Sequence, residues 1–213
     1  MKLDESVDTQ SVVYIIDDDA GMREALTSLL GSVGLRVETF AAASEFLGKK
    51  LPDAATCLVV DIRLPGISGL DFQAELTRAN IDIPIIFITG HGDIAMTVKA
   101  MKAGAVEFFS KPFRDQDLLD AVKAALEKDE ARRRTRKIAS GVRALYETLT
   151  PREQQVIALV TAGLMNKQVA AQMAVSEITV KVHRGNAMRK MKAGSLAELV
   201  RMADLLGVRH IPG

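Results

Sequence analysis

The chain has no tryptophan and only one cysteine, Cys57, among its 213 residues. One cysteine cannot form an internal disulfide or a zinc site, which excludes a disulfide-stapled or zinc-finger-like protein. No apolar run approaches the roughly 18 residues of a membrane span. The polar first ten residues lack the apolar core of a signal peptide. We therefore expect a cytoplasmic protein with no membrane partner, in which Cys57 is an inert part of the core.

Overall charge is also nearly absent, because the net charge of +1 is the balance of two unlike halves. Residues 1–126 carry 12 Lys and Arg against 19 Asp and Glu, a net charge of −7, whereas residues 127–213 carry 16 against 8, a net charge of +8. This difference indicates two domains with different partners, and a basic half is typical of nucleic-acid binders. Two halves whose solvent-exposed charges happen to differ would give the same totals. The sequence motifs are therefore needed to choose between the two interpretations.

In the acidic half, short apolar runs alternate with helical patterns between Ser11 and about Leu126. Strands are predicted at 12–16, 36–40, 57–60, 85–89 and 106–109. Helices are predicted near 21–33, 44–49, 69–79, 94–103 and 114–126. This alternation predicts an α/β domain over 11–126, a five-stranded parallel sheet with helices on both faces. Residues 1–10 are expected to form a disordered tail.

The sequence pattern of the basic half predicts helices and no strands. Thr150, Pro151 and Glu153 have the spacing of a capping box with proline at the first helical position. Helical patterns follow at 151–162, 167–173, 177–192 and 196–206. The short helix, tight turn and second helix around 167–192 predict a helix-turn-helix. The charged segment 127–147 is expected to be a wholly or partly helical linker, with a plausible break at Ser140-Gly141.

Polar residues that could carry chemistry follow the predicted strands, at the edge where sites form in parallel sheets. They are Asp17, Asp18, Asp61, Thr89 and Lys111. Three neighbouring carboxylates repel each other unless a cation is present, and Mg²⁺ fits a site completed by water and a phosphate. A lysine and a hydroxyl would add an anion site. This set suits transfer of a phosphoryl group to the carboxylate of Asp61.

Four motifs together resemble a response-regulator receiver domain: IIDDD at 15–19, VVDIRLPGISG at 59–69, FITGHGD at 87–93 and KAGAVEFFSKPF at 102–113. The resemblance implies a flavodoxin-like, doubly wound fold that accepts phosphate from a sensor histidine kinase on Asp61. It also implies a cis peptide before Pro112. The implied Mg²⁺ ligands are Asp17, Asp18, Asp61 and the main-chain carbonyl of Arg63, and the implied phosphoryl-binding residues are Thr89 and Lys111.

Phe108 occupies the position of the family's switch aromatic. The resemblance implies that phosphate at Asp61 draws Thr89 inward and frees space for the ring of Phe108. The surface of the fourth helix, fifth strand and fifth helix would then form a homodimer. Arg63 and His91 lie two residues beyond Asp61 and Thr89. We hypothesise that they flank the route of water to the acyl phosphate and tune its lifetime, the alternative being ordinary loop residues.

Residues 149–191 resemble a LuxR-type helix-turn-helix, which places an all-α DNA-binding domain at 148–213. With the TGHGD and MKAGA motifs, the whole chain resembles FixJ-like members of the NarL/FixJ family. The recognition helix would begin after Ser176 and enter the major groove. The residues expected to contact double-stranded DNA are Asn166, Lys167, Thr179, Lys181, Val182, His183, Arg184, Arg189 and Lys190. Some relatives carry a larger basic residue at the position of Gly185, so the base sequence that is read stays open.

The leading hypothesis is a non-enzymatic transcriptional regulator that dimerises and binds DNA when Asp61 is phosphorylated. An aspartate-nucleophile phosphatase is a second hypothesis. The haloacid dehalogenase pattern, however, has a second aspartate two residues after the nucleophile, where this chain has Arg63. A DNA-binding regulator that no longer uses phosphate is the third hypothesis, and the full set of acidic, threonine and lysine residues argues against it.

Overall fold

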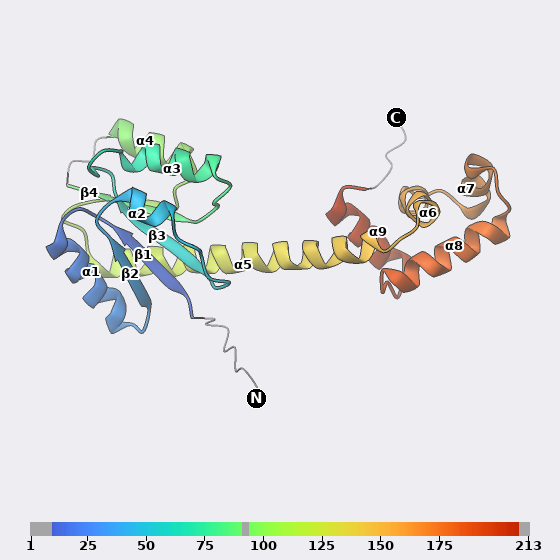
Figure 1. The fold of residues 1–213 in the computed structure, drawn as a ribbon, viewed down its shortest axis with the longest axis horizontal. Coiled ribbons are helices and arrows are strands. Elements are labelled where there is room, and N and C mark those ends of the chain that lie inside the picture. Colours follow the sequence, from blue (N-terminus) through green and yellow to red (C-terminus); the bar gives the residue numbers. More distant parts are fainter. Residues whose placement is uncertain (1–9, 91–93, 209–213) are drawn as a thin grey trace. The chain divides into compact units, whose positions relative to one another are not determined.

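The computed structural model describes residues 10–90 and 94–208 of the chain. It forms two compact units, Met1–Arg133 and Arg134–Gly213 (Figure 1). The predicted tail, apart from Gln10, lies outside the described residues, and so does His91.

The first unit is built on a five-stranded parallel sheet of order β2-β1-β3-β4-β5. Its strands are β1 (Val12–Ile16), β2 (Arg36–Phe40), β3 (Thr56–Asp61), β4 (Ile85–Thr89) and β5 (Glu107–Ser110). The connecting helices are α1 (Ala20–Ser32), α2 (Ala43–Leu47), α3 (Gly69–Arg78) and α4 (Ile94–Lys102), and α5 (Asp115–Glu147) follows β5. The predicted α/β receiver fold is therefore confirmed, and the strand order reverses between β1 and β3 as in a doubly wound sheet.

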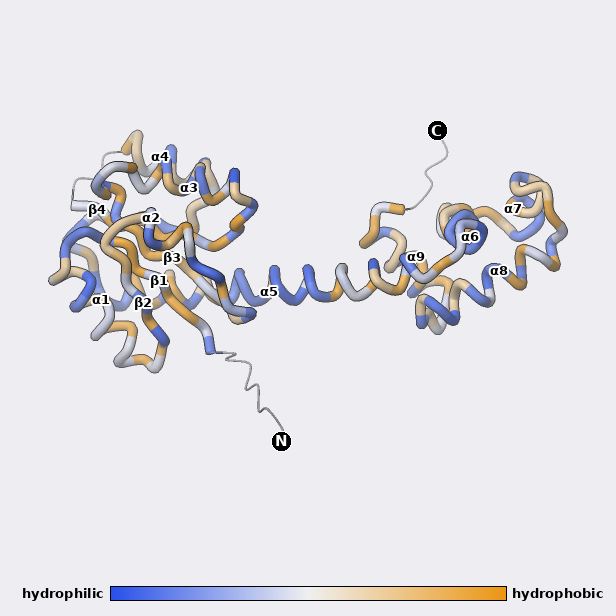
Figure 2. Tube along the Cα trace, viewed as in Figure 1, coloured by the Kyte–Doolittle hydropathy of each residue, from blue (hydrophilic) through white to orange (hydrophobic). Residues whose placement is uncertain are grey.

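The three central strands are buried on both faces, which explains why they are continuous apolar runs rather than alternating ones. Along β1, Val12, Tyr14 and Ile16 join the core cluster that includes Phe72 of α3. Val13 and Ile15 join the cluster on the other face, with residues of α1 and α5. The strands are accordingly the most hydrophobic part of this unit (Figure 2). Cys57 belongs to this core, and its burial, followed by the charge of Asp129, raises the pKa of its thiol.

Helix α5 is continuous from Asp115 to Glu147 and crosses the boundary between the two units. The predicted linker is helical throughout, and the break expected at Ser140-Gly141 is wrong. The segment is mostly hydrophilic (Figure 2), but Val142 is buried and Leu145 and Tyr146 pack against the core of the second unit. This tertiary packing outweighs the cost of glycine in a helix.

The second unit is all-helical, with α6 (Pro151–Thr161), α7 (Asn166–Met173), α8 (Glu177–Lys190) and α9 (Leu196–Leu206) around one apolar core. The capping box predicted at Thr150 and Glu153 is present. Between α7 and α8, Ala174 adopts a left-handed conformation with φ of 54°. Ser176 then caps α8 by accepting a hydrogen bond from Thr179 N. None of the helices in the described ranges is long and apolar enough to cross a membrane.

Candidate metal centre and nucleic-acid interface

Three carboxylates meet at the carboxyl edge of the sheet. Asp17 and Asp18 follow β1, and Asp61 is the last residue of the neighbouring strand β3. Each offers an oxygen atom that lies within 4.8 Å of the others. Asp17 and Asp61 are buried, whereas Asp18 is exposed. The ends of the neighbouring strands thus bring Asp61 together with Asp17 and Asp18, which lie more than 40 positions earlier in the chain, and the exposed Asp18 leaves one side of the cluster open to solvent.

Lys111 joins the two buried carboxylates. Its Nζ donates to Asp17 Oδ2 at 2.9 Å and to Asp61 Oδ2 at 2.8 Å. Burial on its own would lower the pKa of Lys111. The hydrogen bonds to Asp61 and Asp17, with the negative charges of both, raise that pKa above its usual value. The backbone N–H of Lys111 donates to the carbonyl of Thr89 at 2.7 Å, and the following bond to Pro112 is cis.

The remaining carboxylate oxygens are held by backbone groups. Asp61 Oδ1 accepts from the N–H of Arg63 at 2.8 Å, and Asp17 Oδ1 accepts from the N–H of Asp19 at 2.9 Å. Asp19 in turn caps α1 by accepting from the N–H groups of Gly21 and Met22. The carboxylates of Asp17 and Asp61 are therefore oriented before any ligand binds, which is what a preorganised site requires.

The donor set fits a hard cation. Oxygen ligands from carboxylates, with one side open for water, match what Mg²⁺ prefers. Lys111 contacts two of the three carboxylates, and the guanidinium of Arg23 donates to the main-chain carbonyls of Asp17 and Asp18, so the carboxylates still outnumber the positive charges. The sequence did not reveal the part played by Asp19, although an Asp directly before a helical pattern is a recognisable cap signal.

Thr89 lies on β4, the strand beside Asp61, and Phe108 lies on β5, one strand further along the sheet. Thr89 ends β4 and is fully buried, and it pairs in register with Ser110 of β5. Phe108 pairs with Phe87, is half-buried and packs against the core cluster on the α3 side. The two predicted switch residues thus lie on adjacent strands, with Thr89 at the strand end next to that of Asp61.

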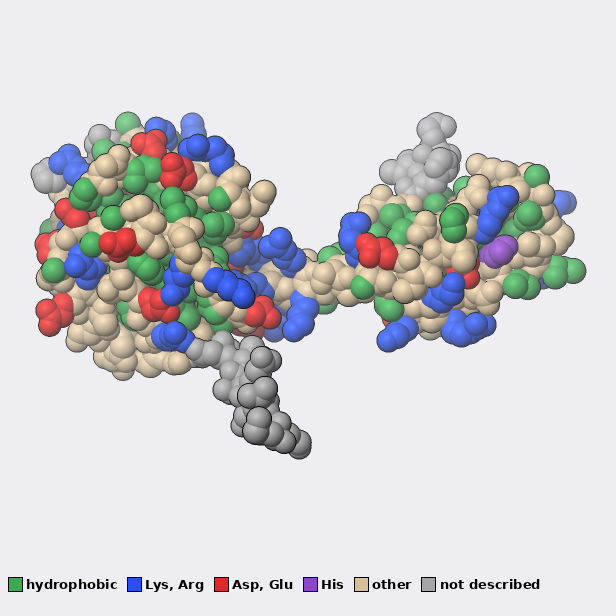
Figure 3. Space-filling view, viewed as in Figure 1, with side chains coloured by type: hydrophobic (Ala, Val, Ile, Leu, Met, Phe, Trp, Pro, Cys, Tyr) green, Lys and Arg blue, Asp and Glu red, His purple; other side chains and the backbone are tan. Residues whose placement is uncertain are grey.

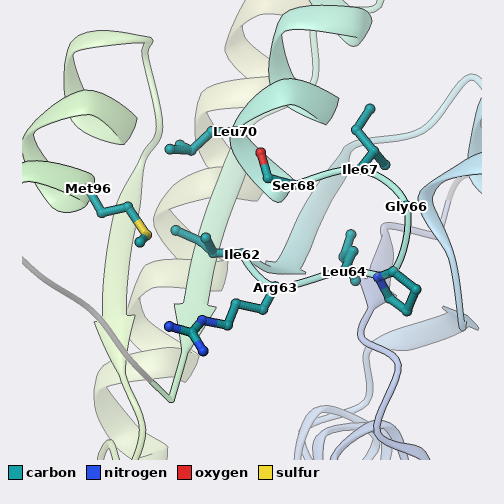
Figure 4. A pocket seen from close by; sticks show the side chains of 9 residues that line it. Ile62, Arg63, Leu64, Gly66, Ile67, Ser68, Leu70 and Met96 are labelled. Carbon is teal, nitrogen blue, oxygen red and sulfur yellow. The ribbon is translucent and has the colours of Figure 1, made fainter.

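A shallow hollow of about 710 Å³ opens directly after Asp61, between the loop that follows β3 and helix α4. In Figure 4 the side chain of Met96 on α4 points toward Ile62, and the guanidinium of Arg63 extends along the rim. Met96 could not be recognised from the sequence, because an apolar residue in an amphipathic helix gives no signal of a site. Arg63 lines this hollow, and His91 lies outside the described residues.

The predicted DNA-contacting residues fall into two groups on the second unit. Lys167, Lys181, Val182 and Arg189 are exposed. The others are half-buried: Asn166, Thr179, His183, Arg184 and Lys190.

Some of the half-buried residues have partners within the fold. Arg184 donates to Asn166 Oδ1 at 3.4 Å, and the Thr179 and Ser176 hydroxyls lie 2.8 Å apart. Lys190 Nζ donates to the buried Glu153 at 2.7 Å. Lys190 therefore has a structural role that its sequence position did not reveal.

Comparison with known proteins matches both units to described families. Residues 13–123 match the family described as the response regulator receiver domain, and residues 147–203 match the luxR family of bacterial regulatory proteins. The fold and site thus define a signal receiver joined to a DNA-binding helix-turn-helix domain.

Whole-chain relatives agree. Nodulation protein W of Bradyrhizobium diazoefficiens is 58% identical over 200 residues, covering 94% of this chain and 88% of that protein. The transcriptional regulatory protein FixJ of the same organism is 40% identical over 200 residues, covering 94% and 98%. The solved structure of the response regulator StyR superposes with a TM-score of 0.80 at 49% identity, covering 92% of this chain and 98% of that one. This chain belongs to the NarL/FixJ family of response regulators.

Proposed function

We propose that this protein is a phosphorylation-dependent transcriptional regulator that accepts a phosphoryl group from a sensor histidine kinase on Asp61. The observation that carries the proposal is Lys111, whose ammonium group lies between Asp17 and Asp61 beside the exposed Asp18. A structural ion pair needs one carboxylate per lysine. Three carboxylates around one lysine leave negative charge for a cation to neutralise.

The chemistry follows from these positions. An oxygen of Asp61 attacks the phosphorus of a phosphohistidine, and the phosphorus–nitrogen bond breaks as the new phosphorus–oxygen bond forms. A bound Mg²⁺, held by Asp17, Asp18, Asp61 and the carbonyl of Arg63, would supply charge neutralisation. Lys111 and the Thr89 hydroxyl would bind the phosphoryl oxygens, so Lys111 would exchange a carboxylate partner for the phosphoryl group.

The output depends on Thr89, Phe108 and helix α4. Phosphorylation would draw Thr89 toward Asp61 and let the half-buried ring of Phe108 move further inward. An apolar stripe on α4 supports a dimer there, since Ile94, Val98 and Met101 are exposed on one face of a helix that packs beside β5. The homodimer would present two copies of α8 to paired half-sites in double-stranded DNA.

On the second unit we propose DNA contacts along the exposed side of α8 and at the start of α7. Val182 would face base edges, and Lys181, Lys167 and Arg189 would face phosphates. Thr179, His183, Arg184 and Asn166 lie at the sides of this surface. Lys190 would have to contact phosphate while its ammonium group stays bonded to Glu153.

Labelling with acetyl phosphate tests the acceptor site. The full chain is incubated with acetyl phosphate and Mg²⁺ and analysed by intact mass, alongside Asp61→Asn, Lys111→Ala and a sample containing EDTA. We expect one phosphoryl group on the wild type, none on Asp61→Asn, and strongly reduced labelling for Lys111→Ala and with EDTA. Labelling of Asp61→Asn would contradict the proposal. Continuous release of inorganic phosphate from simple phosphate esters would favour the phosphatase hypothesis instead.

Arg63 provides a test of the hypothesis about the phosphoryl lifetime. Its guanidinium lines the hollow beside Asp61, where it would limit the approach of water. Phosphorylated Arg63→Ala should lose its label faster than the wild type, and equal rates would contradict this role.

A further inference from the structure

An exposed apolar stripe runs along α8 on the side opposite its buried residues. Val180 and Ala187 face the core. Ile178, Val182 and Gly185 follow each other at spacings of four and three, so they share the opposite face. The Ile178 side chain is 74% exposed and Val182 is 56% exposed. Isolated apolar residues at a surface need no explanation, but aligned ones on a single helix face call for one.

The fold itself does not use this stripe. Neither Ile178 nor Val182 belongs to the apolar core of the second unit. A β-carbon added at Gly185 would meet nothing within 4 Å, and its φ is not in the left-handed region, so neither packing nor backbone geometry requires glycine there. Glycine weakens a helix interior. Close approach of a partner molecule to α8 at Gly185 would explain the glycine.

The surroundings of the stripe indicate its occupant. Lys181 lies beside it and Arg189 continues it one turn beyond Gly185, and both are exposed. Figure 3 shows hydrophobic side chains at the surface of this unit among those of Lys and Arg. A border of positive charge is suited to DNA, where phosphates flank the groove on both sides. In the major groove the apolar group exposed by a base pair is the C5-methyl of thymine.

We propose that Ile178 and Val182 read thymine methyl groups in the major groove, and that Gly185 allows the helix axis to come close enough for both contacts. This inference rests on the proposed function, and it specifies what the recognition helix selects. Base selection on this face comes from apolar contact with thymine, while Lys181 and Arg189 supply attraction to the DNA.

Replacement of thymine by deoxyuridine tests the inference, because it removes only the methyl group. A preferred site is first selected from random duplexes with the phosphorylated full-length chain, and each thymine is then replaced singly. We expect about a fourfold loss of affinity at two thymines in each half-site, which corresponds to one buried methyl group each. The Ile178→Ala and Val182→Ala variants should bind more weakly and should each become insensitive to uracil at one of these positions.

Two further variants serve as comparisons. Lys181→Ala should lose affinity but keep the full sensitivity to uracil, because it removes charge and not the methyl contact. Gly185→Ala should raise the melting temperature of the chain and lower its affinity for the selected site.

The outcomes separate the inference from the function on which it rests. Retention of no duplex by the phosphorylated chain would overturn the proposed function. Tight binding to a selected site in which every thymine tolerates uracil, or to a site without thymine, would overturn the inference and leave the function standing.

Discussion

Gly69 shows how a single residue can determine the path of the loop beside Asp61, the proposed phosphoryl acceptor. A β-carbon at this position would lie 2.8 Å from the carbonyl oxygen of Asp61 and 3.0 Å from Cα of Ile62, both of them backbone atoms. The Gly69 N–H donates to the carbonyl of Ile62 at 2.9 Å, so the close approach is part of the turn.

We expect Gly69→Ala to lower the free energy of unfolding by about 1–3 kcal/mol, as overpacking does, and to slow labelling of Asp61. Gly31→Ala in α1 is the matched control. Its β-carbon meets nothing within 4 Å, and it should stabilise the chain by about 0.5–1 kcal/mol. Urea denaturation measures both effects, and equal shifts for the two variants would refute the steric account.

Glu153 gives the second unit a predictable dependence on pH. Burial would raise the pKa of Glu153. Hydrogen bonds from Lys190 and from Thr150, with the charge of Lys190, outweigh burial and lower that pKa below its usual value. A lowered carboxyl pKa stabilises the folded state above the unfolded pKa of about 4.3, and this stabilisation is lost as the pH falls through the folded value.

Glu153→Gln should therefore destabilise the chain by about 1–2 kcal/mol near neutral pH. The difference in melting temperature from the wild type should shrink as the pH falls below about 5. Glu177→Gln, which changes an exposed carboxylate in the first turn of α8, should show a small difference. A Glu153→Gln deficit that stays constant from pH 7 to pH 3.5 would show that the charge is not responsible.

The site residues differ in how far the sequence could place them. Asp17, Asp61 and Lys111 could be expected together, because parallel strands end at one edge. The bond between Lys190 and Glu153 could not be foreseen, because it depends on how α6 packs against α8. From the sequence alone, a lysine near the end of a basic helix looks the same whether it contacts DNA or a buried carboxylate.

Among the elements, α5 departs most from its prediction. The sequence indicated a helix with a plausible break at glycine, since local propensity was the only guide. Long-range contacts hold the helix on both sides of Ser140-Gly141, at Asp129 against β3 and at Val142 in the second core, and the helix continues between them. The strands followed their predictions to within a residue or two, because the three central ones are continuous apolar runs that stand out from the sequence around them.

Asp129 fixes α5 against strand β3 of the first unit. Its buried carboxylate accepts from the N–H of Thr56 at 2.9 Å and from Arg133 Nε at 2.7 Å, and it also pairs with Arg132. We expect Asp129→Ala to cost about 2–4 kcal/mol of unfolding free energy, because a buried backbone donor and two arginines lose their acceptor.

Asp82→Ala is the control for this loss. Asp82 is 76% exposed and pairs with the same Arg132, so its removal should change stability by less than about 1 kcal/mol. Thermal unfolding of both variants measures the difference. Similar melting temperatures for the two would show that the contact to β3 does not anchor the helix.

For the whole molecule, the exposed apolar stripe on α4 (Ile94, Val98 and Met101) predicts where the homodimer forms. Val98 lies at its centre, and a charge there would have to be desolvated in a dimer. The phosphorylated Val98→Glu chain should stay monomeric at concentrations where the wild type dimerises, while its labelling by acetyl phosphate remains normal. Val33→Glu, at an exposed apolar position after α1, should dimerise as the wild type does. Sedimentation measures both, and a dimeric phosphorylated Val98→Glu would exclude this face.

We propose that phosphorylation of Asp61 controls the pairing of α8 on DNA. The most direct measurement follows oligomeric size and DNA retention on the same samples of wild type and Asp61→Asn, before and after acetyl phosphate with Mg²⁺. We predict that only the phosphorylated wild type shifts to a dimer and gains affinity for paired half-sites, and that Asp61→Asn changes in neither respect. A wild type that takes up the phosphoryl group but shows the same size and the same DNA affinity would contradict the account.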